Sequence, residues 1–167
     1  MIKYSTLPDD PNYLSLDLNP DYLLNYFNWC VAHGIGYSWG AKAPTGTLSN
    51  FPPKYTLSDC SNFVRCLIAY LTSGNLLLPD GSWNQYNWFL TTGQDGIKFK
   101  ESSYSNCGLN DNHIRICFLL EDECGDRHVW LVYQGKTIEC HGSAGTKSRP
   151  WDVSILKDHC NHCFVIT

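Results

Sequence analysis

The sequence predicts an α+β fold, with helices in the first half of the chain and an antiparallel sheet in the second. Apolar residues recur at helical spacing within residues 20–33 and 58–73, whereas the C-terminal half holds short apolar runs separated by turn residues. This order is typical of helices packed on one face of an antiparallel sheet. The 167 residues fit a single domain. We place that domain at residues 19–167, after an extended, proline-containing lead-in at residues 1–18.

The first helix is expected over about residues 20–33. Asn19 can cap it, and Pro20 suits the first turn, where no N–H is needed. Gly34 suits the C-terminal end. The apolar positions of this helix are Leu23, Leu24, Phe27, Cys30 and Val31. Residues 34–57 are rich in Gly and Pro and are expected to form a loop.

The second helix is expected to begin after Ser58, which can cap it, with Asp59 in the first turn, where an anion is favoured. Gly74 is expected to end it. One apolar stripe runs along this helix and consists of Cys60, Phe63, Val64, Leu67, Ile68 and Leu71. A third, short helix is expected over residues 81–89.

The C-terminal half is expected to form four strands. Apolar and β-branched runs place them at residues 114–120, 128–133, 136–140 and 164–166. The dipeptide Gln134-Gly135 predicts a tight turn between the second and third of these strands.

The composition excludes several classes of protein. Hydrophobic residues make up 43% and charged residues 17% of the chain, which excludes a disordered linker. Twelve Lys and Arg against sixteen Asp and Glu give a net charge of −4, which argues against nucleic acid as a partner. No apolar run approaches the roughly 18 residues of a membrane span, and the first residues lack the pattern of a secretory signal. Because nine cysteines are an odd number, at least one is expected to be free or paired between chains.

Cys60 is the candidate nucleophile. A cysteine attacks as the thiolate, and an ordinary thiol, with a pKa of about 8.5, is mostly protonated at neutral pH. The N-terminus of a helix favours the anion, and its free N–H groups can also stabilise an oxyanion during acyl transfer. Cys60 is also the first apolar residue of its stripe, so its position alone leaves a purely structural role open.

His128 is the candidate base. It opens an apolar strand, where a buried ring needs a polar partner. Strand parity places Glu139 and His141 on one face of the next strand and Cys140 on the other. Either Glu139 or His141 can therefore orient the His128 ring. Exposure to water at the strand ends is the alternative for all three.

Three blocks of residues resemble the NlpC-type cell-wall endopeptidases, which are papain-like cysteine peptidases. Residues 59–64, Asp-Cys-Ser-Asn-Phe-Val, look like the family's Asp-Cys-Ser-Gly-Phe-Val motif, with Asn62 in place of the usual Gly. Residues 125–133 are similar to its Gly-His-Val-x-x-Tyr block, and residues 37–40 to its Tyr-x-Trp-Gly block. The resemblance covers about residues 20–145.

The resemblance implies a papain-like fold with the catalytic cysteine at a helix N-terminus. It also implies hydrolysis of peptidoglycan stem-peptide amide bonds, most often the γ-D-glutamyl-diaminopimelate bond, with no cofactor and no metal. The catalytic residues would be Cys60, His128 and His141, with Glu139 as the alternative third residue.

The resemblance further implies supporting residues around the catalytic group. Tyr37 and Ser61 would support the oxyanion site, together with the backbone N–H groups at Cys60. Trp39 and Trp83 would line the substrate groove.

A narrower likeness concerns residues 141–145, His-Gly-Ser-Ala-Gly, and residues 78–84. They are similar to the small amidase effectors of bacterial type VI secretion, in which the position before Gly-Ser is the third active-site residue. This likeness implies a monomer that is made in the cytoplasm and acts on peptidoglycan in the periplasm or cell wall of a target cell, after specialised export or lysis. It also implies a cognate immunity protein. A phage-type lysin with the same chemistry is the alternative.

Three further alternatives follow from the residues. A non-catalytic, disulfide-stapled binding module would hold Cys60 in a bridge. A zinc site would use residues 159–163, His-Cys-Asn-His-Cys, but four ligands so close in sequence cannot easily surround one ion. A circularly permuted lipid acyltransferase of the same fold would have its His block before its Cys block, which is the reverse of the order found.

Overall fold

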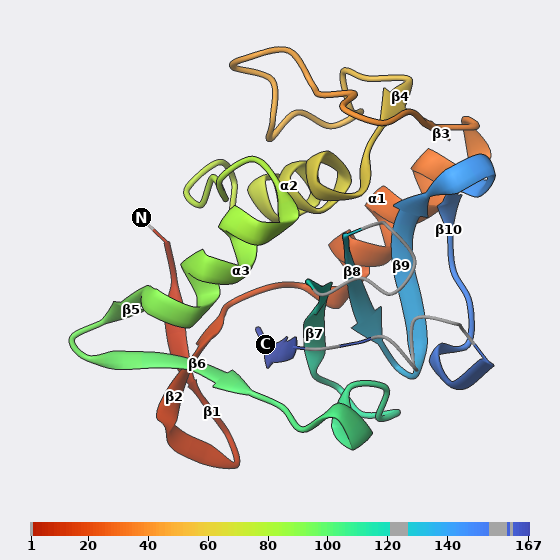
Figure 1. Cartoon of the computed structure of the whole chain (residues 1–167). Helices are drawn as coiled ribbons and strands as arrows, with labels where there is room; N and C mark the ends of the chain where they lie inside the picture. Colours follow the sequence, from red (N-terminus) through yellow and green to blue (C-terminus); the bar gives the residue numbers. More distant parts are fainter. Residues whose placement is uncertain (1, 121–126, 154–159, 161) are drawn as a thin grey trace.

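The structure is a computed structural model, and it describes residues 2–120, 127–153, 160 and 162–167 (Figure 1). Its fold is α+β, as the sequence predicts. The described residues form three α-helices: α1 (Pro20–Ala32), α2 (Cys60–Leu71) and α3 (Ser82–Thr91). Among the described residues, none of the helices has both the length and the apolar character needed to cross a bilayer.

A large, mostly antiparallel sheet forms the centre of the molecule. Its strands are β1 (Tyr4–Leu7), β2 (Asp10–Leu16), β5 (Gly93–Gln94), β6 (Ile97–Glu101), β7 (Ile114–Leu119), β8 (His128–Tyr133), β9 (Lys136–His141), β10 (Gly145–Lys147) and β11 (His162–Val165). They lie in the order β1-β2-β6-β11-β7-β8-β9-β10, and β5 pairs with β6. Only the β2–β6 pair in this sheet is parallel among the described pairings.

Short elements complete the fold. A separate parallel ladder joins β3 (Gly36–Tyr37) to β4 (Leu57–Ser58). Single 3-10 turns are η1 (Tyr104–Asn106), η2 (Gly142–Ala144) and η3 (Trp151–Val153). The β3–β4 ladder brings Tyr37 beside Ser58, so the loop between residues 37 and 58 returns directly to the start of α2.

The helices cover one face of the sheet and enclose the main core (Figure 1). Helix α2 packs on β8 and β9, and α3 packs on β6. The largest fully buried side chains of this core include Tyr26, Phe63, Phe89, Phe118 and Phe164. Burying such aromatic side chains supplies most of the favourable free energy of folding in a core of this kind.

The opposite face of the central strands carries a second, smaller core that contains no residue of the three helices. Its buried residues are Cys107, Cys117, Leu119, Trp130, Val132, Cys160 and Cys163. Strand alternation explains the division, because Val129 and Leu131 of β8 face the helices whereas Trp130 and Val132 face away.

The predicted helices and the central strands are confirmed, with small shifts at their ends. Asn19 caps α1 by accepting a hydrogen bond from the Asp21 N–H at 2.9 Å. The cap of α2 is Asp59 rather than Ser58, which makes Cys60 the first helical residue. The reason is that the Asp59 carboxylate reaches the Asn62 N–H at 2.7 Å, whereas the Ser58 hydroxyl accepts from the Asn62 side chain.

The N-terminal segment is more structured than an extended lead-in. Strands β1 and β2 form a hairpin that extends the sheet, and Leu7, Leu14 and Leu16 are buried. The prolines suggested a break, but Pro11 lies near the start of β2, where a strand tolerates proline. Strand β6 was also not predicted, because its pairing with β2 joins residues far apart in the sequence.

Candidate active site

The N-terminus of α2 positions Cys60 at one end of the sheet. Asp59 fixes this turn, because its Oδ1 accepts hydrogen bonds from the Asn62 N–H at 2.7 Å and from the Ser61 hydroxyl at 3.1 Å. Lys42 donates to the other oxygen of the same carboxylate and to Ser61 Oγ. Cys60 is a free thiol with 9% of its surface exposed, and it lines an open cleft.

His128 lies against the Cys60 sulfur. His128 is the first residue of β8 and lies at the end of the sheet, where its ring is close enough to Cys60 for the thiol to raise the pKa of the imidazole. Its Nε2 lies 3.1 Å from Glu139 Oε1. Because Nε2 is taken by Glu139, the other ring nitrogen, Nδ1, is the one left for the thiol. The indole of Trp130 stacks on the imidazole with a centroid distance of 5.3 Å and limits its rotation.

Glu139 holds His128 from the neighbouring strand β9. The side chain of Glu139 is fully buried and also accepts two hydrogen bonds from the Arg149 guanidinium, at 2.8 Å to Oε1 and 3.1 Å to Oε2. A buried carboxylate is costly without such partners. The chain of contacts therefore runs from Arg149 through Glu139 and His128 to Cys60.

The charges along this series of contacts stabilise one another. Burial raises the pKa of Glu139, but hydrogen bonds from His128 and Arg149 outweigh it and hold the pKa at about 2. Burial lowers the pKa of His128, but the hydrogen bonds with Cys60 and Glu139, and their negative charges, raise it to about 9. Glu139 is therefore ionised at neutral pH, and His128 favours the imidazolium that a Cys–His pair requires.

This pKa shift predicts a loss of stability at alkaline pH. His128 titrates near 9 in the folded chain and near its ordinary value of about 6.5 when unfolded. Its contribution to stability is then complete below pH 6.5 or so and lost as pH rises through about 9. Denaturant unfolding at a series of pH values should show this loss, and His128→Gln should reduce it.

His141→Gln is the matched control for that measurement. Burial lowers the pKa of His141, which gives the opposite sign of pH dependence. The loss between neutral and alkaline pH should therefore persist in His141→Gln. Equal slopes in the wild type and His128→Gln would contradict the assignment.

His141 lies near Glu139 and His128 but does not hold the His128 ring. The two ring centroids are 5.8 Å apart, and His141 Nε2 is 3.8 Å from Glu139 Oε1. Within the described residues, that nitrogen has no hydrogen-bond partner. The structure thus brings Glu139, the alternative third residue, to the imidazole and leaves His141, the first choice, on the cleft wall.

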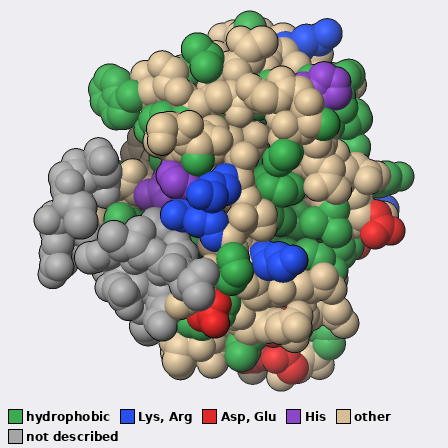
Figure 2. All heavy atoms as spheres, turned by 90° about the vertical axis from the view of Figure 1, so that its right-hand side faces the viewer, with side chains coloured by type: hydrophobic (Ala, Val, Ile, Leu, Met, Phe, Trp, Pro, Cys, Tyr) green, Lys and Arg blue, Asp and Glu red, His purple; other side chains and the backbone are tan. Residues whose placement is uncertain are grey.

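The cleft beside Cys60 has a volume of about 760 Å³. Tyr37, Ser61 and Trp39 line the cleft, and Trp39 is 87% exposed. Trp83 lies beside the cleft, next to the lining residue Ser82, with the Arg127 guanidinium 5.7 Å from its ring centroid. On the face shown in Figure 2, histidine side chains lie next to Lys and Arg side chains.

Three cations of the cleft were not found from the sequence. Lys42, Arg127 and Arg149 all line it, although the whole chain carries a net charge of −4. Lys42 also pairs with Asp80 at 2.7 Å. Arg149 lies beyond the residues that carry the family resemblance, and only the fold brings it back to Glu139. The signal that could have pointed to Arg149 is Glu139, because a carboxylate buried in a strand needs a cation as its partner.

Comparison with known proteins yields a likeness of fold. No family model matches the chain, and a search of the curated proteins finds no match. Among solved structures, it is similar to a protein of Staphylococcus aureus subsp. aureus Mu50 described as similar to lipoprotein, NLP/P60 family. The TM-score is 0.53 and the sequence identity 13%, over 91% of this chain and 43% of that chain.

The chain therefore spans less than half the length of that protein. At this identity the likeness concerns the fold, which is of the kind found in an NlpC/P60 family protein. The fold agrees with the one implied by the three sequence blocks.

Proposed function

We propose that the protein is a cysteine peptidase or amidase that uses Cys60 as nucleophile, His128 as base and Glu139 as the residue that orients the base. The observation that carries the proposal is the contact chain at the N-terminus of α2. A thiol, an imidazole and a buried carboxylate follow one another within hydrogen-bonding reach at the wall of an open cleft. This arrangement is that of a nucleophile, a base and an orienting group.

The reaction begins with transfer of the Cys60 proton to His128. The thiolate attacks the amide carbon, and the carbonyl oxygen becomes an oxyanion. As the C–N bond breaks, His128 returns the proton to the leaving amine, and an acyl-enzyme remains. His128 then takes a proton from water, the hydroxide releases the acid, and the thiol is restored.

The first turn of α2 supplies the oxyanion site. The Asp59 carboxylate accepts a hydrogen bond from the Asn62 N–H, and the Asp59 carbonyl accepts one from the Phe63 N–H. The N–H groups of Cys60 and Ser61 precede them in the turn, at the positive end of the helix dipole. Such donors stabilise the developing negative charge most strongly in a site partly shielded from water.

For the substrate we propose a peptidoglycan stem peptide, cleaved at the γ-D-glutamyl-diaminopimelate amide bond. Two features support this choice: the fold is similar to that of an NlpC/P60 family protein, and cations line the cleft. Stem peptides carry free carboxylates next to this bond, and Lys and Arg side chains attract them. We further propose that the chain acts on the wall of a target cell, as a type VI effector with an immunity partner or as a lysin.

Digestion of purified peptidoglycan tests the function. Mass spectrometry of the soluble fragments should show new free γ-D-glutamyl carboxyls and new diaminopimelate amines, in equal amounts. Glycan fragments with intact stem peptides would point to another activity. The disulfide-stapled module is not supported, because Cys60 is a free thiol, as are the seven other cysteines in the described part of the chain.

A further inference from the structure

Four cysteines meet on the face of the sheet opposite the three described helices. Cys117 lies within β7 and Cys163 within β11, and the register places the two directly opposite each other. Cys107 follows the η1 turn, and Cys160 precedes β11. All four are buried. None of them takes part in the proposed reaction, so their convergence needs a separate explanation.

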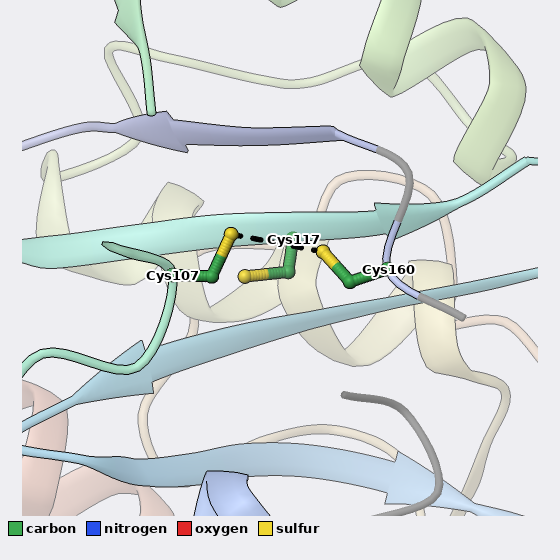
Figure 3. A group of neighbouring side chains, drawn as sticks. All are labelled: Cys107, Cys117 and Cys160. Carbon is green, nitrogen blue, oxygen red and sulfur yellow. Dashed lines mark hydrogen bonds between the residues drawn. The ribbon is translucent and has the colours of Figure 1, made fainter. Parts of the chain in front are cut away.

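Three of the sulfur atoms form one compact group, and the fourth, that of Cys163, lies beside the sulfur of Cys117. Cys117 Sγ lies 3.4 Å from Cys163 Sγ, and Cys107 Sγ lies 3.8 Å from Cys160 Sγ. The sulfurs of Cys107, Cys117 and Cys160 all lie within 4.8 Å of one another, and Figure 3 shows them pointing toward a common centre. Cys163 joins the group through Cys117, its partner across the β7–β11 register.

The spacing of the three grouped sulfurs, and of the Cys117–Cys163 pair, is close to that of a tetrahedral metal site. With Zn–S bonds of about 2.3 Å, the sulfurs of a tetrathiolate zinc site lie about 3.8 Å apart. A disulfide instead needs an S–S distance of about 2.05 Å. We propose that Cys107, Cys117, Cys160 and Cys163 together bind one structural Zn²⁺ ion.

The pattern of the ligands along the chain is also that of a zinc site. Cys160 and Cys163 form a Cys-x2-Cys pair, and Cys107 and Cys117 supply two ligands from a distant segment. The sequence predicted no metal, and the zinc alternative drew its four ligands from residues 159–163 alone. His162 has other partners: its Nδ1 forms a hydrogen bond with Glu101 at 2.7 Å, and its ring packs on Tyr86. His159 and Asn161 lie outside the described residues.

A buried cation lies next to the group. Four thiolates and one Zn²⁺ carry a net charge of −2, which is costly in a protein interior without compensation. Arg115 is 4% exposed, and its positive charge acts on both Cys117 and Cys163. Its two terminal nitrogens bind Asp111 at 2.8 and 2.7 Å, but within the described residues its buried Nε–H has no acceptor. A thiolate sulfur is an acceptor of the required charge, and such outer hydrogen bonds are usual around metal sites.

The location explains what the ion would do. Among the described residues, this face is covered by the turns η1 and η3, and its apolar core is small. Trp151 packs so closely on Gly108 that a Cβ there would lie 1.8 Å from its ring. A metal bound by Cys107 and Cys160 would tie the covering segments to β7 and β11, since metal binding adds directly to folding free energy.

Metal analysis tests the proposal on the full chain. Protein purified under reducing conditions with added zinc should hold one Zn²⁺ per chain after dialysis, and Cys163→Ser should lose most of it. Cys66→Ser is the control, because Cys66 is a buried cysteine outside the group, and it should keep the metal. If Cys163→Ser does not fold, the zinc content of the wild-type protein still tests the proposal. Co²⁺ in place of zinc should produce the charge-transfer and visible bands of a tetrahedral tetrathiolate site, and a strong chelator should lower the unfolding temperature.

Two results would overturn the proposal. One is an intact mass lower by the hydrogens lost in two disulfides, with no zinc bound. The other is a fully reduced chain that binds neither Zn²⁺ nor Co²⁺ stoichiometrically. Neither measurement, of intact mass or of bound metal, depends on peptidoglycan hydrolysis. The zinc proposal and the catalytic role of Cys60 can therefore fail independently.

Discussion

Replacement of Cys60 by Ala should lower the turnover of peptidoglycan by about 10⁴-fold or more, since loss of a nucleophile removes the covalent pathway itself. The fold should persist, because Cys60 lies at the first position of α2 and the Asp59 cap does not depend on its sulfur. Initial rates of fragment release, measured beside circular dichroism spectra of the same samples, check both expectations.

Cys66→Ala is the matched control for this experiment. Cys66 is on the same helix, but it faces the core and is 1% exposed. Its truncation leaves a small cavity and should cost stability rather than activity. A Cys60→Ala protein with wild-type activity would refute the catalytic assignment, as would equal losses in the two variants.

Replacement of Glu139 by Gln should lower kcat by a factor on the order of 10⁴, by analogy with loss of the orienting carboxylate in catalytic triads. Gln keeps an oxygen near His128 Nε2 but loses the negative charge that stabilises the imidazolium. The pKa of His128, about 9 in the native chain, should therefore fall. The alkaline limb of the pH profile of kcat/KM should move to lower pH, which a purely structural defect would not produce.

His141→Gln is the comparison that separates the two candidates for the third residue. It removes a ring that lines the cleft but leaves the Glu139–His128 hydrogen bond in place, so the pH profile should keep its alkaline limb. The opposite pattern, with His141→Gln shifting the limb and Glu139→Gln not, would assign the role to His141. Denaturant unfolding must accompany both variants, because loss of one partner of a buried ion pair costs about 3–5 kcal/mol and Arg149 would lose its carboxylate.

Local signals predicted the elements that carry the site. Asn19 and Pro20 marked the start of α1, and the apolar stripe from Cys60 to Leu71 marked α2. These patterns act within a few residues, so they can be read without the fold. The same limit explains the one-residue error at the cap of α2, because Ser58 and Asp59 are both good caps and only the turn geometry decides between them.

Contacts between residues far apart in the sequence could not be predicted. Strand parity correctly put Glu139 and His141 on one face, but the choice between them depends on how side chains on β8 and β9 lean across the sheet and on Arg149, which only the fold brings near. The N-terminal hairpin depends in the same way on the β2–β6 pairing. The cysteine group joins Cys107 to Cys160 across 53 residues, and no spacing rule within one segment reveals that contact.

The pairing of Cys60 with His128 can be tested by the rate at which Cys60 is alkylated. Native protein at neutral pH is treated with limiting iodoacetamide, and mass spectrometry of peptides gives the rate at each cysteine. We expect Cys60 to react first, and to react much more slowly in His128→Gln, because the imidazolium no longer stabilises the thiolate. If Cys60 reacts no faster than the other buried cysteines, or equally fast with and without His128, then His128 does not activate Cys60.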